Sequence, residues 1–262
     1  LDVFWAPKVE QMEHNKIQSL GYESMFPRLG FTYWLSINPN RLGLSERQWI
    51  QKNLNPESFG LGSMGPEVSK ARQLFLPKGP GRIEEPAVAQ FWKNIETSKK
   101  PKSTDTLRFL VYEKFALKNE IIRKLETSGY KVEVSTYANF TEYADLGSKV
   151  EEFDIVQVNM DFSHLDLRGG LDVTFRKSRP LIFIEKSEST LSRLLKTINT
   201  EVDDPKRFKA ITDVGLHLLR KGQIVPLYYY KTMFYHKPEF DLSDWSEIVP
   251  EMAMWKVKRK SN

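Results

Sequence analysis

An acidic residue ends a segment that otherwise has the pattern of a buried strand. Residues 153–158, FDIVQV, are mostly apolar and β-branched, which predicts a core strand, yet the chain continues at once into polar positions. A carboxylate at a strand exit can accept charge-assisted hydrogen bonds from the ammonium group of a ligand. The predicted ligand site comprises Asn159, Met160, Asp161 and Phe162.

The position of this acid also has a structural interpretation. In an open parallel sheet, ligands collect in the crevice outside the carboxyl ends of the strands, which favours a binding role for Asp161. The alternative is that Asp161 caps the next turn or pairs with Arg168. The pattern alone leaves both interpretations open.

Two aromatic clusters present the same choice. The first is TYW, which ends at Trp34, and the second is YYY at residues 228–230. Packing in the core or at a hinge is the default expectation for such clusters, and stacking against a ligand is the alternative.

Several other chemistries lack the residues that they need. There is no cysteine, and none of the four histidines has a His or carboxylate partner at zinc-ligand helical spacing, so we expect neither a metal nor a cofactor. Ser63 is not preceded by a strand, which argues against a hydrolase elbow. The GLGSMG segment at 60–65 follows a predicted helix and precedes Pro66, so it indicates a glycine turn and not a dinucleotide loop.

The composition indicates a folded globular protein. The chain has 262 residues, of which 40% are apolar, enough for one large domain or two smaller ones. The net charge of +5 is dispersed, which argues against nucleic-acid binding. No apolar run reaches membrane-spanning length. Because Leu1 is not an initiator methionine, we expect a processed protein or a fragment.

The elements that must position these residues alternate along the chain. We expect strand, helix and strand within 1–42, then a helix in LSERQWIQKNLN capped by Ser45. The Gly- and Pro-rich residues 55–86 predict a long connection that follows the surface. Further along, 87–160 predict a helix and then the order βαβαβ, which implies parallel strands joined by crossover helices.

The last third of the sequence predicts two helices, two strands and a further extended segment. RPLIFIE at 179–185 has a strand pattern, and STLSRLLKTI at 189–198 has a helical one. Residues 203–222 predict the clearest helix, with an Asp204 cap, Pro205 at the first helical position and Phe208 among the core residues. QIVPLYYYKTMFYHK then predicts an extended segment, followed by a loop that closes on a final strand.

In this order, the segments resemble family 5 solute-binding proteins, the extracytoplasmic receptors of dipeptide and oligopeptide importers. The resemblance rests on GFTYWLSINPN, LSERQWIQKNLN, GLGSMGPEV, EEPAVAQFWKNIETS, residues 121–162 and residues 207–237. It implies an α/β fold of the periplasmic-binding-protein type II-like class, with a mixed, mainly parallel sheet and covering helices. It also implies a non-enzymatic monomer that holds a short peptide or similar solute between two lobes and delivers it to an ABC permease.

The resemblance assigns roles to individual residues. Asp161 matches the acid that receives the amino terminus of a peptide, with Phe162 at the position of a usual aromatic. Asn38 matches the asparagine that ends the hinge strand, and closure would occur about the strands near Asn38 and Pro226. The tryptophan and proline-rich continuation usual near the acid are absent, as is a second arginine in LSERQWIQK, so the ligand class stays open.

The same resemblance implies an organisation into lobes. Residues 1–42 would be a remnant of the first lobe with the hinge strand, 43–225 the second α/β lobe, and 226–262 a return segment to the first lobe. The implied location is periplasmic, or extracytoplasmic and membrane-associated. Two other hypotheses remain: a ligand-sensing domain of a transcriptional regulator, and an α/β enzyme that uses scattered carboxylates.

Overall fold

The computed structural model describes residues 3–5, 11–62, 64–65, 68–77, 79, 81–101, 106–161, 167–175, 181–186, 188–241 and 258–260. The strands are β1 (Val3–Trp5), β2 (Glu23–Ile37), β3 (Val68–Lys70), β4 (Thr106–Tyr112), β5 (Lys131–Tyr137), β6 (Ile155–Asp161), β7 (Ile224–His236), β8 (Phe240–Asp241) and β9 (Lys258–Arg259). The α-helices are α1 (Gln11–Ser19), α2 (Leu44–Asn53), α3 (Glu85–Ile95), α4 (Lys118–Thr127), α5 (Phe140–Asp145), α6 (Leu167–Thr174), α7 (Ser189–Thr200) and α8 (Asp204–Arg220). The 3-10 helices are η1 (Pro56–Ser58) and η2 (Gly147–Glu152).

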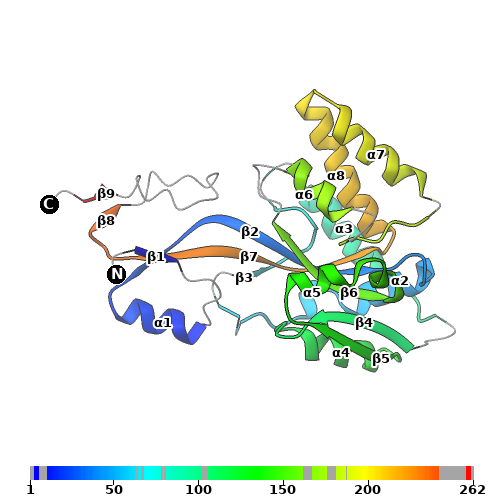
Figure 1. Ribbon diagram of the computed structural model, residues 1–262, viewed down its shortest axis with the longest axis horizontal. Coiled ribbons are helices and arrows are strands. Elements are labelled where there is room, and N and C mark those ends of the chain that lie inside the picture. The colour runs from blue at the N-terminus through cyan, green and yellow to red at the C-terminus, as the bar shows by residue number, and fades with distance from the viewer. Residues whose placement is uncertain are drawn as a thin grey trace.

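One sheet of seven strands organises the molecule (Figure 1). Its strand order is β1-β7-β2-β6-β4-β5, and β3 pairs with β7 beside this path. The predicted mixed α/β sheet is confirmed, with β4 parallel to both β5 and β6. The expectation that the sheet is mainly parallel needs correction, because β7 and β2 pair antiparallel with their neighbours and β2 pairs antiparallel with β6.

The connections around β4 reverse direction across the sheet. From β4 the chain passes through α4 to β5 on one side, then returns through α5 and η2 to β6 on the other side. The strand order therefore has a topological switch point between β4 and β6, where the carboxyl ends of parallel strands leave a crevice.

Side-chain alternation builds a core on each face of the sheet. On β2, Trp34 belongs to the core under α3, α7 and α8, whereas Leu35 belongs to the core under α2 and α4. Val156 and Ile155 divide in the same way on β6. The result is a three-layer arrangement of helices, sheet and helices.

Two long strands extend beyond this layered part. Figure 1 shows β2 and β7 running out to β1, α1, β8 and β9 at the far end of the molecule. The division into 1–42, 43–225 and 226–262 stays a prediction. The carboxyl half of β2 is nevertheless built into the layered part, because residues 31–37 pair with β6. Within the described residues, no helix has both the length and the hydropathy needed to span a bilayer.

Two predicted helix caps are displaced by a residue or two. The cap of α2 is Gly43 and not Ser45, and the Gly43 N–H donates to the Glu46 carboxylate at 2.9 Å. The cap of α8 is Asp203 and not Asp204, because the Asp203 carboxylate accepts the N–H of Lys206 at 3.0 Å. In each case the helix begins where a carboxylate can satisfy a free backbone donor.

The segment at 55–86 does not simply follow the surface. Leu74 and Phe75 are buried in the core next to α8, and the Tyr229 hydroxyl donates to the carbonyls of Gln73 at 2.9 Å and Phe75 at 3.0 Å. The surrounding glycines and prolines hid a short apolar stretch that fills the core. Conversely, Phe208 is 37% exposed and not a core residue.

RPLIFIE also differs from its predicted form. Within the described residues 181–186 there is no strand, although Leu181, Ile182 and Phe183 are buried. Both edges of β6 are already paired, with β2 and β4, so this segment packs on the face of the sheet. The Phe183 N–H is satisfied by the hydroxyl of Ser36 at 3.3 Å.

Candidate functional site

A cavity opens where β4 and β6 diverge. The two strands pair only at Phe109–Ile155 and Leu110–Val156, whereas β6 remains paired with β2 as far as Asp161. Beyond this short pairing the carboxyl ends of the two strands separate at the topological switch point. The sequence of connections thus creates the opening, as expected for open α/β sheets.

The cavity has a volume of about 650 Å³. This volume lies within the range of about 300–1,000 Å³ that is typical of small-molecule sites. Its walls come from strands on both sides of the opening and from the turns that follow β4 and β5. The lining residues are Tyr33, Met64, Val68, Tyr112, Lys114, Phe115, Ala116, Tyr137, Ala138, Asn139, Phe140, Tyr143, Gln157, Val158, Asn159, Leu181, Tyr228 and Tyr230.

Aromatic rings form much of the wall. Tyr33 stacks on Tyr228 with ring centroids 4.5 Å apart and planes 17° apart, and Phe115 lies nearly parallel to both. On the other side, Tyr137 lies between Tyr112, at 5.9 Å, and Tyr143, at 5.2 Å. Such rings hold one another in place and offer flat apolar surfaces to a ligand.

Gln157 bridges the gap between the diverging strands. Its side-chain oxygen accepts the backbone N–H of Tyr112 at 3.3 Å, and its backbone carbonyl accepts the Tyr137 hydroxyl at 2.8 Å. The side chain is almost fully buried, at 1% exposure. These bonds replace the strand pairing that is lost after Val156 and fix the floor of the cavity.

Three tyrosines of the cavity, Tyr33, Tyr137 and Tyr228, stay neutral around physiological pH. Burial, together with the neighbouring Tyr230 and Tyr112, raises the pKa of Tyr33 to about 12. Burial likewise raises the pKa values of Tyr137 and Tyr228. These three hydroxyls can therefore donate and accept hydrogen bonds but supply no negative charge.

Besides the tyrosines, Lys114 and Asn159 offer polar side chains to a ligand. Among the described lining residues Lys114 is the only charged one, and it is exposed and makes no ion pair with a described residue. Asn159 is half-buried on β6, directly opposite Tyr33 on β2. Its side-chain amide forms no hydrogen bond within the described part of the chain.

The structure separates the six predicted site residues. Asn159 lines the cavity, whereas Met160 and Trp34 belong to the core on the other face of the sheet. The backbone of Asp161 pairs with Phe31 at the end of β6, but its carboxylate lies outside what the structure describes. Phe162 also lies outside the described residues.

Asn38 lies at the opposite end of β6 from Asn159. Its amide nitrogen donates to the carbonyls of Glu151 at 3.0 Å and Phe153 at 3.1 Å, while its oxygen accepts the Asn40 N–H at 3.0 Å. It is 1% exposed and is not among the residues that line the cavity. These contacts give Asn38 a structural role at the start of β6.

Four residues of the cavity were not predicted from the sequence: Tyr112, Lys114, Tyr137 and Gln157. Tyr112 and Tyr137 are the last residues of β4 and β5, so the strand-exit rule applied to Asp161 would also have identified them. No local signal marks Gln157, because its role depends on the divergence of β4 from β6. The TYW and YYY clusters contribute Tyr33, Tyr228 and Tyr230 to the cavity.

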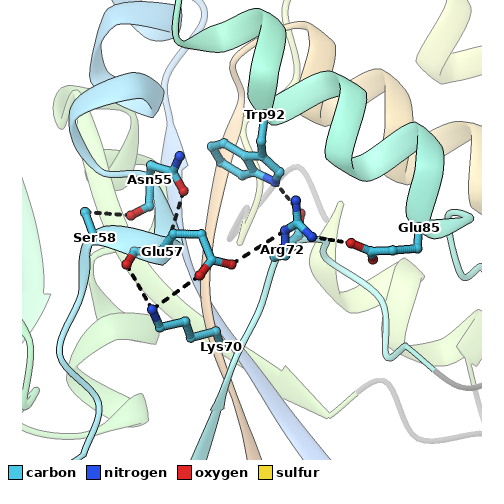
Figure 2. Close-up of polar contacts among 7 residues, drawn as sticks. All are labelled: Asn55, Glu57, Ser58, Lys70, Arg72, Glu85 and Trp92. Carbon is cyan, nitrogen blue, oxygen red and sulfur yellow. Dashed lines mark hydrogen bonds and ion pairs between the residues drawn. The ribbon is translucent and has the colours of Figure 1, made fainter.

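A polar network fixes β3, which carries Val68, against the layered part (Figure 2). Figure 2 shows Arg72 between Glu57 and Glu85, with the Trp92 indole donating to the Arg72 carbonyl at 2.9 Å. Lys70 donates to the Glu57 carbonyl at 2.9 Å on the other side. Since these pairs are partly exposed, each contributes at most about 1 kcal/mol.

A second, polar cavity of about 360 Å³ lies beyond the carboxyl end of β2, where α2 begins. Arg47 at its edge is buried and donates to the carbonyls of Lys221 at 2.8 Å and Leu42. These bonds mark Arg47 as a structural residue. Among the residues that the structure describes, no group of three or more His, Asp or Glu could hold a metal ion.

Comparison with known proteins identifies the fold. No protein-family model and no curated protein matches the sequence. Among solved structures, NikA from Brucella suis in complex with Fe(III)-EDTA has a TM-score of 0.73 at 15% identity, and covers 99% of this chain and 58% of its own. DppA from Helicobacter pylori in complex with the peptide STSA has a TM-score of 0.69 at 13% identity, and the match covers 100% of this chain and 53% of DppA.

A substrate-binding protein from Microbacterium hydrocarbonoxydans, complexed with 4-hydroxybenzoate hydrazide, has a TM-score of 0.60 at 13% identity. The match covers 92% of this chain and 51% of that protein. Such neighbours are family 5 solute-binding proteins, so the likeness confirms the predicted fold class. The chain spans about half the length of these solved structures.

Proposed function

We propose that this chain is the carboxyl-side portion of a non-enzymatic solute-binding protein. It holds a short peptide or a similar small solute in the cavity between β4 and β6. The observation that carries this proposal is the 650 Å³ cavity at the topological switch point, with tyrosines from β2, β4, β5 and β7 in its walls.

The chemistry of the cavity suits capture of a peptide-like solute. Aromatic rings offer apolar contact, while the amide of Asn159, which has no partner among the described residues, can pair with a peptide group. We also propose that Asp161, two residues after Asn159 on β6, receives the amino terminus of the ligand. Peptide-bound DppA and the dipeptide-binding protein complexed with Met-Leu, which share the fold, support a peptide ligand.

The proposed role is delivery of the solute to an ABC permease from an extracytoplasmic location. The fold neighbours include a periplasmic murein tripeptide-binding protein, which supports this location. Uptake of a labelled ligand should fall to background in cells that lack the gene. Unchanged uptake together with altered transcription would instead indicate the ligand-sensing domain of a regulator.

Thermal unfolding with and without ligands tests solute binding. We expect a pool of dipeptides to raise the melting temperature and a pool of sugars to leave it unchanged. A ligand at about 100 times its Kd adds about 2.7 kcal/mol to the free energy of unfolding, which corresponds to a shift of roughly 5–10 °C for a protein of this size.

Two pairs of variants locate the site. Asn159→Leu should reduce the peptide-induced shift, whereas Asn119→Leu on the exposed surface of α4 should not. Asp161→Asn should reduce it as well, and Asp145→Asn at the end of α5 serves as its control. A shift with sugars alone would refute the peptide ligand, and a peptide shift that survives Asn159→Leu and Asp161→Asn would place binding elsewhere.

A further inference from the structure

The solute-binding function proposed above leaves the chemical class of the solute open, and the charges of the cavity restrict it. Lys114 is the only charged residue among the described lining residues. The hydroxyls of Tyr33 and Tyr137 remain neutral, so they cannot balance its ammonium group. A ligand anion would therefore find a complementary cation in the wall.

The turn that carries Lys114 is fixed at both ends. The Glu113 N–H donates to the Tyr137 carbonyl at 3.0 Å, and the Phe115 N–H donates to the Tyr112 carbonyl at 3.0 Å. Lys118 also donates to the Glu113 carbonyl, at 2.8 Å. The backbone of Lys114 is thus held at the exits of β4 and β5, while its side chain is exposed at the cavity.

The aromatic wall selects for shape. Tyr33, Tyr228 and Phe115 lie with their planes 11° to 17° apart. Tyr33, Tyr112, Tyr137 and Tyr230 are half-buried, so parts of these rings remain accessible from the cavity. A flat ring of a ligand gains more contact with such a surface than a short aliphatic chain does.

We propose that the preferred solute carries a planar aromatic ring and a free carboxylate. The ring packs against the tyrosine wall, the carboxylate pairs with Lys114, and the Asn159 amide binds a polar group between them. The inference deepens the proposed function, because it identifies the class of peptide or peptide-like acid that the cavity takes.

Four probes separate the parts of this proposal in binding titrations. Ala-Phe has the ring and the carboxylate, its carboxamide derivative lacks the carboxylate, Ala-Ala lacks the ring, and 3-phenylpropanoate lacks the amine. We expect Ala-Phe to bind about tenfold more tightly than its carboxamide and than Ala-Ala, as a single charge-assisted contact or ring contact warrants. 3-Phenylpropanoate should bind measurably as well.

Lys114→Met is the decisive variant. It should weaken Ala-Phe and 3-phenylpropanoate about tenfold, change binding of the carboxamide less than twofold, and abolish the preference for the free acid. Lys149→Met removes the same charge from an exposed residue outside the cavity and should change none of these values. Higher salt should weaken the acid more than the carboxamide, because the lysine is exposed.

The outcomes distinguish the two proposals. Equal affinity for acid and carboxamide, or an equal effect of Lys114→Met and Lys149→Met, overturns the carboxylate assignment. Equal affinity for Ala-Phe and Ala-Ala overturns the ring assignment. In both cases dipeptides still bind, so the proposed function stands. If 3-phenylpropanoate binds but neither dipeptide does, the proposal of a peptide ligand is wrong and the proposal of an aromatic acid stands.

Discussion

Buried polar residues at strand ends can look like ligand contacts in the sequence. Asn38 resembles a hinge asparagine of a binding protein, yet each polar atom of its side chain already contacts a backbone group. Asn159 has the same side chain, but its amide has no hydrogen-bond partner among the described residues and is therefore available to a solute. The two residues differ because Asn38 lies beside the start of β6, whereas Asn159 is near its carboxyl end, and this placement follows from the strand pairing.

Replacing Asn38 should affect stability and not binding. Asn38→Ala removes three hydrogen bonds and leaves buried backbone groups unsatisfied, so we expect a loss of about 2–3 kcal/mol in the free energy of unfolding. Urea denaturation measures this loss, with exposed Asn119→Ala as a control expected within about 0.5 kcal/mol. A variant of normal stability that no longer binds peptide would assign Asn38 to the ligand site.

A nearly buried carboxylate couples stability to pH. Glu188 accepts the Thr190 N–H at 2.8 Å, and its carboxylate lies 3.3 Å from His217 and 3.7 Å from Lys221. Burial acts to raise the pKa of Glu188, but that hydrogen bond and the two neighbouring bases outweigh it, so the pKa falls below its usual 4.5. Burial and Lys221 lower the pKa of His217 below 6.5, against the opposing effect of Glu188.

The two shifts act in the same direction. A lowered histidine pKa favours the neutral ring, so its contribution to stability is present above about pH 6.5 and is lost as the pH falls toward the lowered pKa. The contribution of Glu188 is present above 4.5 and is lost at more acidic pH, as the pH falls through its lowered pKa. Acid should therefore destabilise the protein in two successive ranges.

His217→Gln isolates the first of these ranges. Wild-type stability should decline as the pH falls from about 6.5 to 5, whereas the variant should decline less, because glutamine does not titrate. Urea denaturation at a series of pH values measures both slopes, and the two proteins should have similar slopes between pH 7 and 8. Identical slopes below pH 6.5 would show that His217 does not contribute to the acid response.

At the scale of elements, α2 completes the carboxyl end of α8. Gln51 donates to the carbonyls of Leu219 and Ile224, both at 2.9 Å, and Arg47 donates to that of Lys221. The bonds to Leu219 and Lys221 satisfy acceptors that a helix end leaves free, and the bond to Ile224 ties α2 to the start of β7. Gly222 has φ +66°, and a Cβ there would lie 2.7 Å from the Cβ of Arg47.

Two glycines with positive φ allow a matched test of this packing. Gly147→Ala, at φ +52° with open space around it, should cost about 1–2 kcal/mol from backbone strain alone. Gly222→Ala adds the clash with Arg47 and should cost about 1–3 kcal/mol more. Chemical denaturation of both variants measures the difference, and equal losses would show that α2 and α8 yield easily at this contact.

Periodic patterns explain why most of these elements could be predicted. The helix at 204–220, the units β4-α4-β5 and β5-α5-β6, and the extended segment of β7 all follow from apolar spacing and from stop signals such as Gly129, which has φ +103°. The buried stretch at Leu74 and Phe75 could not be predicted, because short apolar runs without a period resemble loops. Its burial depends on contacts with Tyr229 and α8, more than 130 residues away.

At the scale of the whole molecule, the site depends on connectivity. The parallel order of β4, β5 and β6 and the strand-exit position of Asn159 could be predicted from the sequence. The antiparallel addition of β2 and β7 could not, because sheet order is a long-range property. These two strands supply Tyr33, Tyr228 and Tyr230, without which the crevice would lack one wall.

The most direct test of the switch-point cavity is a crystal structure of the protein with the dipeptide that gives the largest thermal shift. We expect electron density for the peptide between β4 and β6, in contact with Tyr33, Asn159 and Lys114. Density for the peptide in the polar cavity beside Arg47 and Lys221, with the tyrosine-lined cavity unchanged, would contradict the proposed site.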